Sequence, residues 1–398
     1  MWKLVKLGFG LLFLAIAIHG NETLEQQKVA LKNKLDNMAE NNESIHGKIK
    51  PFKDGLLGEG LFGVVFKGKL VSDNKTIVAI KFSRKEQMEK AKREFEMYSH
   101  LKAVDNPNIE RFGIPNVYYF NEWDRYMVTV FSYFGDGDLI DGFNAQQISI
   151  ATNIDTLILF REFVRQSKYV HSCGIRHDDI KLENIMFRKH RSFLIDFDCS
   201  SKMDEDNRGG TFEYLSRRYT GQGIRNALDD YESFLYAMCR MHFVPLKWFA
   251  LEPNYQNLTH FNEIVQQSSR MRNNISDTIV QINERIVLEP LKLVFLKFAN
   301  ETFRSDSRFP DYDGLYDVID GEIKKFHRPW FTRLTDDQIA EAERELIDNP
   351  LPDIRKDIAD PKDFNYVYDP VNYTRFYEGK RERENDIVMA KNKYPRLI

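Results

Sequence analysis

The sequence predicts an α+β protein with a small β-rich part, residues 51–131, followed by a larger and mostly helical part, residues 136–327. Two observations support this prediction. The segments TIVAIKF, residues 76–82, and YMVTVF, residues 126–131, are rich in β-branched and aromatic residues, as strands are. The larger part contains the octet HDDIKLEN, residues 177–184, and soon after it an apolar strand that ends in LIDFD.

The small part begins with a glycine pattern. Gly58, Gly60 and Gly63 in LLGEGLFGVVFKG match G-x-G-x-x-G-x-V, and Val65 closes the pattern. In a dinucleotide-binding fold this pattern opens a helix, whereas here residues 64–66 continue as β-formers. We therefore expect a loop between two strands, of the kind that lies over phosphates.

The next strand, TIVAIKF, has a period of two. Its alternation places Val78, Ile80 and Phe82 on one face of the sheet and Ala79 and Lys81 on the other. We expect Ala79 to line an adenine site and Lys81 to reach the phosphates.

The octet and the LIDFD strand place four polar side chains within twenty residues, namely Asp179, Lys181, Asn184 and Asp196. Together these side chains can supply a proton acceptor, a phosphate contact and two metal ligands around one nucleotide. The pattern indicates phosphoryl transfer from ATP.

VAIK, HxDxKxxN and DFx occur in this order, and over roughly residues 52–327 the chain resembles a eukaryotic protein kinase domain. The resemblance implies a two-lobed protein kinase fold with a small lobe over 51–131, a hinge over 132–135 and a large lobe over 136–327. It implies Lys81 as the phosphate lysine and Asp179 as the base. It also implies Asn184 and Asp196 as ligands of Mg²⁺, with Mn²⁺ as an alternative metal.

In this family the lysine pairs with a glutamate on the following helix, and AKREFEMYSHL offers Glu94 and Glu96. Met97 and Tyr98 lie three and four residues after Glu94, so a helix that buries them also turns Glu94 inward. Glu94 is the predicted partner, and Glu96 is expected in solvent.

The resemblance also implies an adenine site at the hinge. Phe131 would be the gatekeeper, and the backbone of Ser132, Tyr133 and Phe134 would bond adenine. The residues expected to bind the nucleotide are Leu57, Gly58, Gly60, Gly63, Val65, Ala79, Lys81, Phe131, Ser132, Phe134 and Met186.

Lys181, two residues after the predicted base, is typical of kinases that act on serine or threonine. GGTFEYLS at 209–216, DDYESFLY from Asp229 and FRSDSRFPDYDGL at 303–315 resemble blocks of the casein kinase I group. In that alignment Asp230 braces the backbone of the catalytic loop.

The predicted partner is a protein or peptide with a serine or threonine acceptor. An acidic substrate could bind at Arg217, Arg218 and Arg225, although arginines on a surface are more often simply exposed to solvent. A net charge of −3 with interspersed signs gives no field that would attract nucleic acid.

Two positions depart from the family pattern. Asp178 replaces the arginine that, in kinases switched by phosphorylation, pairs with the phosphorylated loop. An aspartate would repel such a loop, so we expect activity without loop phosphorylation, and we expect Arg176 to be a surface arginine. Asp198 replaces the glycine of Asp-Phe-Gly and could bind a second metal, although a local turn contact is favoured.

Such departures leave two alternatives to a protein kinase. One is a pseudokinase scaffold that binds ATP without transferring phosphate, which the complete set of catalytic residues disfavours. The other is a kinase that acts on a sugar or another small molecule. Lys181 together with the Gly-Thr-x-x-Tyr block favours a peptide acceptor.

The first residues, 1–20, have the layout of a secretory signal peptide, with lysines before an apolar run at 7–18. A helix over this run would be about 18 Å long, shorter than the hydrocarbon core of a membrane, so no stable membrane span is expected after cleavage. Glycosylation sequons begin at Asn21, Asn42, Asn74, Asn257, Asn274, Asn300 and Asn372. We expect a secreted glycoprotein or one retained in the lumen of the secretory pathway.

The remaining segments flank the predicted domain. Leu24, Leu31, Leu35 and Met38 have helical spacing and predict one amphipathic helix within residues 21–50. Within 328–398, Thr335 with Gln338 predicts a capping box that opens a helix. We expect the segment after that helix to form an extended tail.

Overall fold

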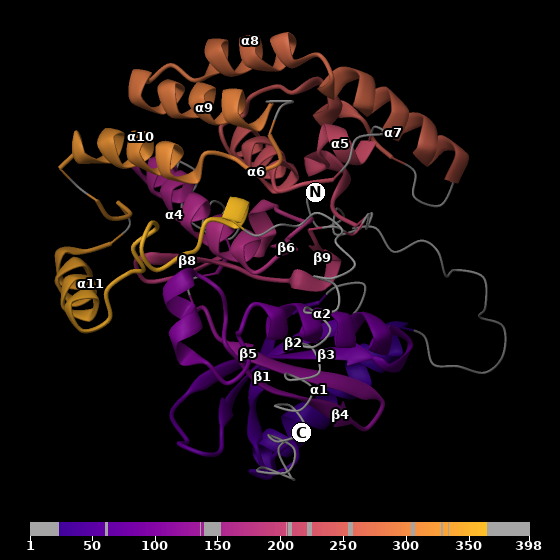
Figure 1. The fold of residues 1–398 in the computed structure, drawn as a ribbon. Coiled ribbons are helices and arrows are strands. Elements are labelled where there is room, and N and C mark those ends of the chain that lie inside the picture. Colours follow the sequence, from indigo (N-terminus) through magenta and orange to yellow (C-terminus); the bar gives the residue numbers. More distant parts are fainter. Residues whose placement is uncertain are drawn as a thin grey trace. The chain divides into compact units, whose positions relative to one another are not determined.

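The computed structural model describes residues 24–59, 63–135, 137–138, 153–203, 205, 209–220, 225–253, 258–303, 307–327, 329–332 and 334–363. The described residues form two compact units, and both can be followed along the chain in Figure 1. The first unit comprises described residues up to 107 together with 115–133. The second comprises 108–114 and the described residues from 134 to 363. No helix among them is long and apolar enough to cross a membrane.

The first unit contains a five-stranded antiparallel sheet in the order β1-β2-β3-β5-β4. Its strands are β1 Ile49–Glu59, β2 Gly63–Leu70, β3 Ile77–Arg84, β4 Val117–Trp123 and β5 Tyr126–Ser132. The strands predicted from the apolar alternation are therefore present. Val78, Ile80 and Phe82 are fully buried on one face of β3, as the period of two requires.

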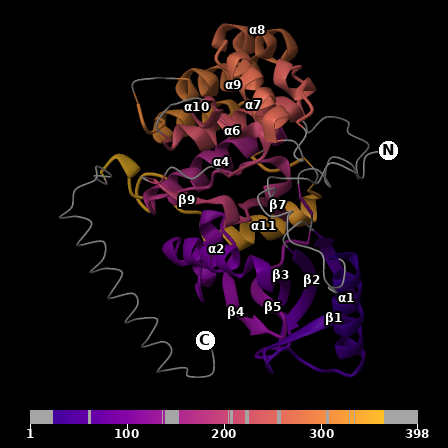
Figure 2. The same ribbon diagram turned by 90° about the vertical axis from the view of Figure 1, so that its right-hand side faces the viewer.

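Helix α1, Leu24–Glu40, lies along β1 (Figure 2). Its buried side chains Leu31, Leu35 and Met38 belong to the same apolar core as the buried face of β3. The amphipathic helix predicted within residues 21–50 is present. It covers one face of the sheet and belongs to the core of the first unit.

Helix α2, Met88–His100, contacts β3 and β5. It buries Ala91, Glu94, Met97 and Tyr98 and leaves Glu96 exposed. The choice of Glu94 over Glu96 as the inward-facing glutamate is confirmed.

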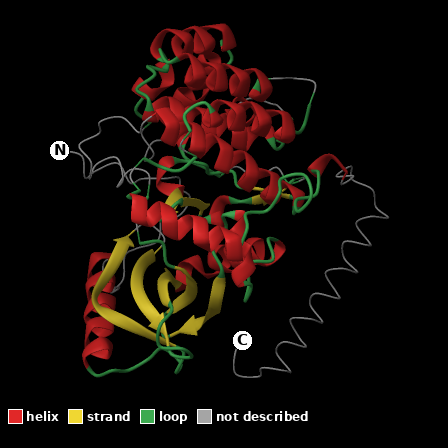
Figure 3. Cartoon of the chain, turned by 90° about the vertical axis from the view of Figure 1, so that its left-hand side faces the viewer, coloured by secondary structure: helices red, strands yellow, loops and turns green. Residues whose placement is uncertain are grey.

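The second unit is mostly helical (Figure 3). Its described helices are α4 Asn153–Ser172, α5 Arg217–Thr220, α6 Leu228–Met241, α7 Leu258–Arg272, α8 Ile275–Arg285, α9 Glu289–Thr302, α10 Tyr312–Lys324 and α11 Asp336–Asp348. Helix α4 is buried along most of its length because aromatic rings from neighbouring helices surround it. Phe163 of α4 stacks on Phe234 of α6 with ring centroids 3.9 Å apart.

Two short antiparallel strand pairs flank the catalytic residues of this unit. β6, Ile175–Arg176, pairs with β9, Ser201–Lys202, and β7, Ile185–Arg188, pairs with β8, Arg191–Leu194. Helix α11 begins at the predicted capping box, in which the Thr335 hydroxyl accepts from the Gln338 amide and the Gln338 side chain accepts from the Thr335 amide. The predicted signal peptide and the tail from residue 364 lie outside the described residues.

Candidate active site

Lys81 on β3 and Glu94 on α2 form the predicted ion pair. Lys81 Nζ lies 3.0 Å from Oε1 and 2.9 Å from Oε2 of Glu94. The Glu94 side chain is only 3% exposed, so this carboxylate depends on its partner for compensation of its charge. The bidentate contact fixes the lysine ammonium relative to the sheet.

The strand register places three other predicted nucleotide residues, Val65, Ala79 and Phe131, on the face that carries Lys81. Val65 is directly opposite Lys81, and Phe131 is directly opposite Ala79. Opposite residues of antiparallel strands point to the same side, so these four side chains share one face. Phe131 packs against Tyr98 of α2 with ring centroids 5.0 Å apart.

Gly58 and Gly63 of the glycine pattern differ in the space around them. A Cβ at Gly63 would collide with the carbonyl of Phe82 on the neighbouring strand, so this position serves the sheet. A Cβ at Gly58 would meet nothing within 4 Å, so this glycine leaves open space beside the strand. Leu57 is 43% exposed, and Gly60 lies outside the described residues.

The predicted hinge is partly strand. β5 extends to Ser132, whose amide donates to the carbonyl of Asn116 at 3.0 Å and whose hydroxyl accepts from the Asn116 amide at 3.0 Å. The amide of Ser132 is thus already bonded within the first unit. In the second unit, Phe134 is buried and stacks on Phe193, and Met186 lies partly exposed on β7.

Asp179 is the centre of the catalytic loop. Its Oδ2 accepts from Lys181 Nζ at 2.8 Å, and its Oδ1 accepts from the Thr211 hydroxyl at 2.7 Å. Lys181 also donates to the Thr211 hydroxyl at 3.2 Å. Burial opposes the charge on Lys181, but the neighbouring Asp179 outweighs it and raises the pKa of the ammonium. The three side chains form a closed triangle, and the sequence did not identify Thr211 as a member.

The two predicted metal ligands are brought close together by the β7–β8 pair, because the amide of Ile195 donates to the carbonyl of Asn184 at 3.1 Å. The Asn184 side-chain nitrogen donates to the Asp179 carbonyl at 2.9 Å, which leaves its oxygen as the group that can face a cation. Asp196 has a left-handed backbone (φ 65°) and is partly exposed.

This donor set fits Mg²⁺, which prefers a few oxygen ligands from the protein together with substrate phosphates. No group of three or more His, Cys, Asp or Glu that could hold a metal occurs among the described residues. The ligands that the protein does not supply would have to come from phosphate and water. Asp198, the second departure from the family pattern, is partly exposed in the turn after Asp196.

Asp230 braces the catalytic loop, as predicted. Its Oδ2 accepts from the His177 amide at 2.8 Å, and its Oδ1 accepts from the Asp178 amide at 2.9 Å. Burial alone would raise the pKa of Asp230, but the hydrogen bond from His171 Nε2 and the charge of the neighbouring histidines lower it. The loop backbone is therefore bonded to a carboxylate that stays ionised.

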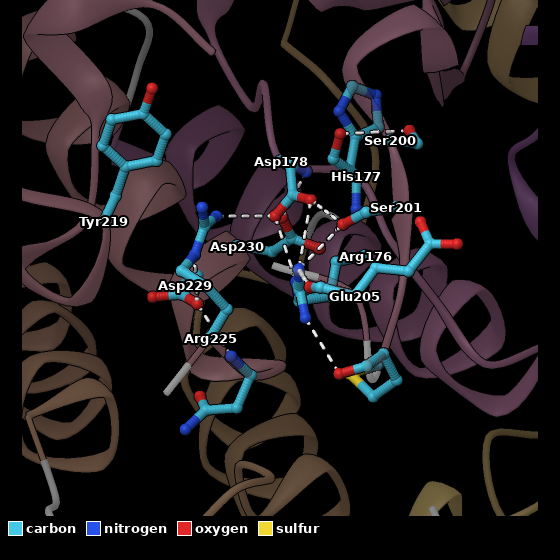
Figure 4. A network of polar contacts seen from close by, with 12 residues as sticks. Arg176, His177, Asp178, Ser200, Ser201, Glu205, Tyr219, Arg225, Asp229 and Asp230 are labelled. Carbon is cyan, nitrogen blue, oxygen red and sulfur yellow. Dashed lines mark hydrogen bonds and ion pairs between the residues drawn. The ribbon is translucent and has the colours of Figure 1, made fainter. Parts of the chain in front are cut away.

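Two expectations were wrong, namely that Asp178 is a charge able to repel a phosphorylated loop and that Arg176 is a surface arginine. Asp178 is not a free charge that would repel a modified loop, because its side chain is fully buried against Arg176 and Arg225. Arg176 is not a surface arginine, because none of its surface is exposed. Figure 4 shows both guanidinium groups directed at Asp178.

The three arginines proposed to receive an acidic substrate are bound inside the second unit. Arg217 donates to Glu232 through its amide at 2.7 Å and its Nε at 3.3 Å. Arg218 lies 3.7 Å from the same carboxylate, and Arg225 pairs with Asp178 and Asp229. All three guanidinium groups are therefore already paired with carboxylates of the second unit.

Arg272 is a site residue that sequence reasoning missed. It is fully buried at the end of α7 and donates to the carbonyls of Phe212, Glu213 and Leu215. Its guanidinium lies over the Trp248 ring, 4.8 Å from the centroid. Because these carbonyls directly follow Thr211, Arg272 holds the segment that places Thr211 on Asp179.

Residues 53–284 match the protein kinase domain family. The chain is 28% identical over 200 residues to the serine/threonine-protein kinase KIN4 of Saccharomyces cerevisiae, an alignment that covers 47% of this chain and 24% of that protein. It is 34% identical over 160 residues to calmodulin-binding receptor-like cytoplasmic kinase 1 of Arabidopsis thaliana, covering 38% of this chain and 32% of that protein. It is 30% identical over 141 residues to the human serine/threonine-protein kinase ULK1, covering 35% of this chain and 13% of that protein.

The chain belongs to the protein kinase domain family, because the match spans more than half of its length. The β-rich first unit and the helical second unit are the two parts of that fold, which confirms the predicted fold class. The chain spans about a third or less of the length of these three relatives.

Proposed function

We propose that the chain is an ATP-dependent protein kinase that phosphorylates serine or threonine hydroxyls. The observation that carries this proposal is the closed triangle of Asp179, Lys181 and Thr211 on a loop braced by Asp230. A carboxylate held beside an ammonium is the arrangement that orients a substrate hydroxyl and stabilises the transferred phosphoryl group. The relatives named as serine/threonine-protein kinases support the same acceptor class.

Each residue has one role in the proposed reaction. Lys81, fixed by Glu94, contacts the ATP phosphates, and Asp179 accepts the proton of the acceptor hydroxyl. Lys181 contacts the γ-phosphate and compensates the charge that develops on it. Asn184 and Asp196 would hold Mg²⁺ or Mn²⁺, which neutralises the phosphate oxygens.

A peptide acceptor is favoured over a small molecule. Lys181 donates a hydrogen bond to Thr211, and Arg272 donates to the carbonyl of the next residue, Phe212. The catalytic loop is therefore bonded to an ordered stretch of backbone, against which a peptide substrate can lie. The Gly-Thr-x-x-Tyr block in this stretch, together with the helix that starts at Asp229, also supports a place near the casein kinase I group.

The test is transfer of labelled γ-phosphate to a mixture of serine, threonine and tyrosine peptides, with Asp179→Asn as the matched variant. Asp179→Asn keeps the shape of the side chain and should abolish transfer, while Mg-ATP should still raise its melting temperature. Unmodified protein that is stabilised by Mg-ATP but labels no peptide would support the pseudokinase alternative instead. Labelling of free sugars in place of peptides would support the small-molecule alternative.

We further propose that the protein enters the secretory pathway. The support is the signal-like segment at residues 1–20 together with the sequons. The four sequon asparagines that the structure describes, Asn42, Asn74, Asn274 and Asn300, are exposed, as a glycan requires. Treatment of the protein from its own host cells with a glycosidase should increase its mobility on a gel, and unchanged mobility would contradict the proposal.

A further inference from the structure

Asp178 is paired with two guanidinium groups, and the three charged side chains are all buried. Its Oδ1 lies 2.7 Å from Arg225 Nη2 and 3.1 Å from Arg176 Nε. Its Oδ2 accepts a hydrogen bond from the Ser201 hydroxyl. All three partners are buried, so the contacts are charge-assisted hydrogen bonds in a medium of low dielectric constant.

Arg176 joins Asp178 to the segment 201–229, which follows β8 and the predicted metal ligand Asp196. Its Nη1 donates to the Met203 carbonyl at 2.9 Å, and its Nη2 donates to the Glu205 carbonyl at 2.7 Å and to the Ser201 hydroxyl at 2.8 Å. Arg176 thus bonds three residues at the start of this segment, and the Ser201 hydroxyl adds a direct contact to Asp178.

Arg225 joins Asp178 to the other end of the segment, just before α6. Its Nε donates to Asp229 at 2.9 Å, and Asp229 in turn accepts from the Ser216 hydroxyl at 2.5 Å. The guanidinium also lies over the ring of Tyr219, 5.0 Å from its centroid (Figure 4). Burial works against this charge, but Asp178 and Asp229 outweigh it and raise the pKa of Arg225.

The backbone of Asp178 couples these contacts to the catalytic residue that follows it. Asp178 has a left-handed conformation (φ 64°), which a non-glycine residue keeps only where its surroundings fix it. The segment also lies close against its carbonyl, because a Cβ at Gly210 would come within 2.7 Å of that oxygen. Next to Gly210 is Thr211, which donates to Asp179.

In kinases whose loop is ordered by phosphorylation, an arginine of the protein pairs with an added phosphate. Here the signs of the two charges are exchanged. The catalytic loop supplies the anion, Asp178, and the segment 201–229 supplies the cation, Arg225. The anion belongs to the chain itself, so no modification is needed to create the pair.

We propose that Asp178 is a positioning residue that, paired with Arg225 and Arg176, orders both ends of the segment 201–229 and thereby holds Asp179 and Thr211 in their active arrangement without added phosphate. This inference rests on the proposed kinase function. Asp178 itself touches no substrate and acts through the two arginines and the loop backbone.

The experiment compares phosphatase-treated wild type with Arg225→Gln, Arg225→Lys, Asp178→Asn and the double variant Asp178→Asn/Arg225→Gln. Arg355→Gln is the control, because it breaks an exposed pair with Asp317 elsewhere in the second unit. Peptide kinetics give kcat and the KM for ATP, at a temperature where melting curves show every variant folded. Hydrogen exchange is followed in peptides covering 201–203 and 212–219.

We expect phosphatase-treated wild type to keep its full activity. Arg225→Gln and Asp178→Asn should each lower kcat roughly tenfold or more and leave the KM for ATP within about twofold, because a small displacement of Asp179 affects the chemical step. Exchange should rise in the two segments. Arg225→Lys should recover part of the loss, and the loss in the double variant should be smaller than the sum of the two single losses, because both substitutions break the same ion pair.

The inference is overturned if Arg225→Gln keeps the wild-type kcat and exchange pattern, or if phosphatase treatment inactivates the wild type. A wild type that transfers no phosphate, combined with a local rise of exchange in Arg225→Gln, overturns the proposed function and supports the ordering role of the pair. Loss of kcat without a change in exchange overturns the ordering role and leaves the kinase function intact.

Discussion

The ammonium of Lys81 lies within 3.0 Å of both carboxylate oxygens of Glu94, and the glutamate is almost completely buried. Lys81→Met removes the charge that contacts phosphate and leaves the carboxylate without its partner. We expect kcat/KM to fall at least about 100-fold, the usual result of removing one donor to a developing charge. Steady-state kinetics with a peptide substrate would measure the loss.

Two variants make this prediction specific. Glu94→Gln keeps the volume of the side chain but removes its charge, so it should lose activity while the fold melts near the wild-type temperature. Lys92→Met on the same helix removes an exposed lysine paired with Glu89 and should change nothing. Equal losses for Lys81→Met and Lys92→Met would contradict the proposed role of Lys81.

Helix α1 should be required for the stability of the first unit. Leu35 is fully buried in the core that α1 shares with the sheet. Leu35→Ala should lower the free energy of unfolding by about 2–5 kcal/mol, because the deleted atoms leave a cavity between the helix and the sheet. Val29→Ala, on the same helix but 56% exposed, should cost less than about 0.5 kcal/mol. Urea unfolding curves that coincide for the two variants would contradict this packing.

Arg272 should control use of the peptide substrate. Arg272→Lys keeps a positive charge but cannot reach the carbonyls of Phe212 and Leu215 together, because an ammonium has no planar fork. We expect the KM for peptide to rise severalfold and the protein to lose about 1–3 kcal/mol of stability from unsatisfied carbonyls. Arg270→Lys, at an exposed position on the same helix, is the control. An unchanged KM for peptide in Arg272→Lys would exclude this role.

The parts of the site that the sequence predicted are those within short stretches of chain. Strand alternation placed Lys81 on one face of the sheet, and helical spacing chose Glu94 over Glu96. Both are consequences of local geometry, which depends on residues only a few positions apart. Asp230 was found because a run of acidic and aromatic residues resembled a helix start of the family.

The parts that the sequence missed depend on contacts between distant segments. Asp178 is contacted by Arg176, Ser201 and Arg225, although up to 49 positions separate these three residues. A periodic pattern in the sequence cannot predict contacts between residues so far apart. Arg272 lies in a tract without a recognisable motif, and it was therefore not considered. The expectation for Asp178 considered the charge of the side chain but not its burial. A buried carboxylate stays ionised only where cations pair with it, and otherwise it becomes protonated.

His242 should make the stability of the second unit depend on pH. It follows the last residue of α6, and its Nε2 lies 2.8 Å from the Thr156 hydroxyl on α4. Burial, with a smaller contribution from the charge of Arg285, lowers the pKa of His242 to about 4. The folded protein therefore holds a neutral imidazole at a pH where the unfolded chain, with a pKa near 6.5, binds a proton.

Stability should fall as the pH decreases from about 6.5 to 4, because over this range the unfolded state binds one more proton at this position. The contribution of His242 to the loss between pH 7 and pH 5 should be about 1–2 kcal/mol. His242→Gln cannot bind that proton, so its free energy of unfolding should fall less over the same interval. Urea titrations at both pH values would measure the difference, with His327→Asn at an exposed position as the control. A wild type and a His242→Gln variant with the same pH dependence would show that His242 is protonated in the folded state as readily as in the unfolded chain.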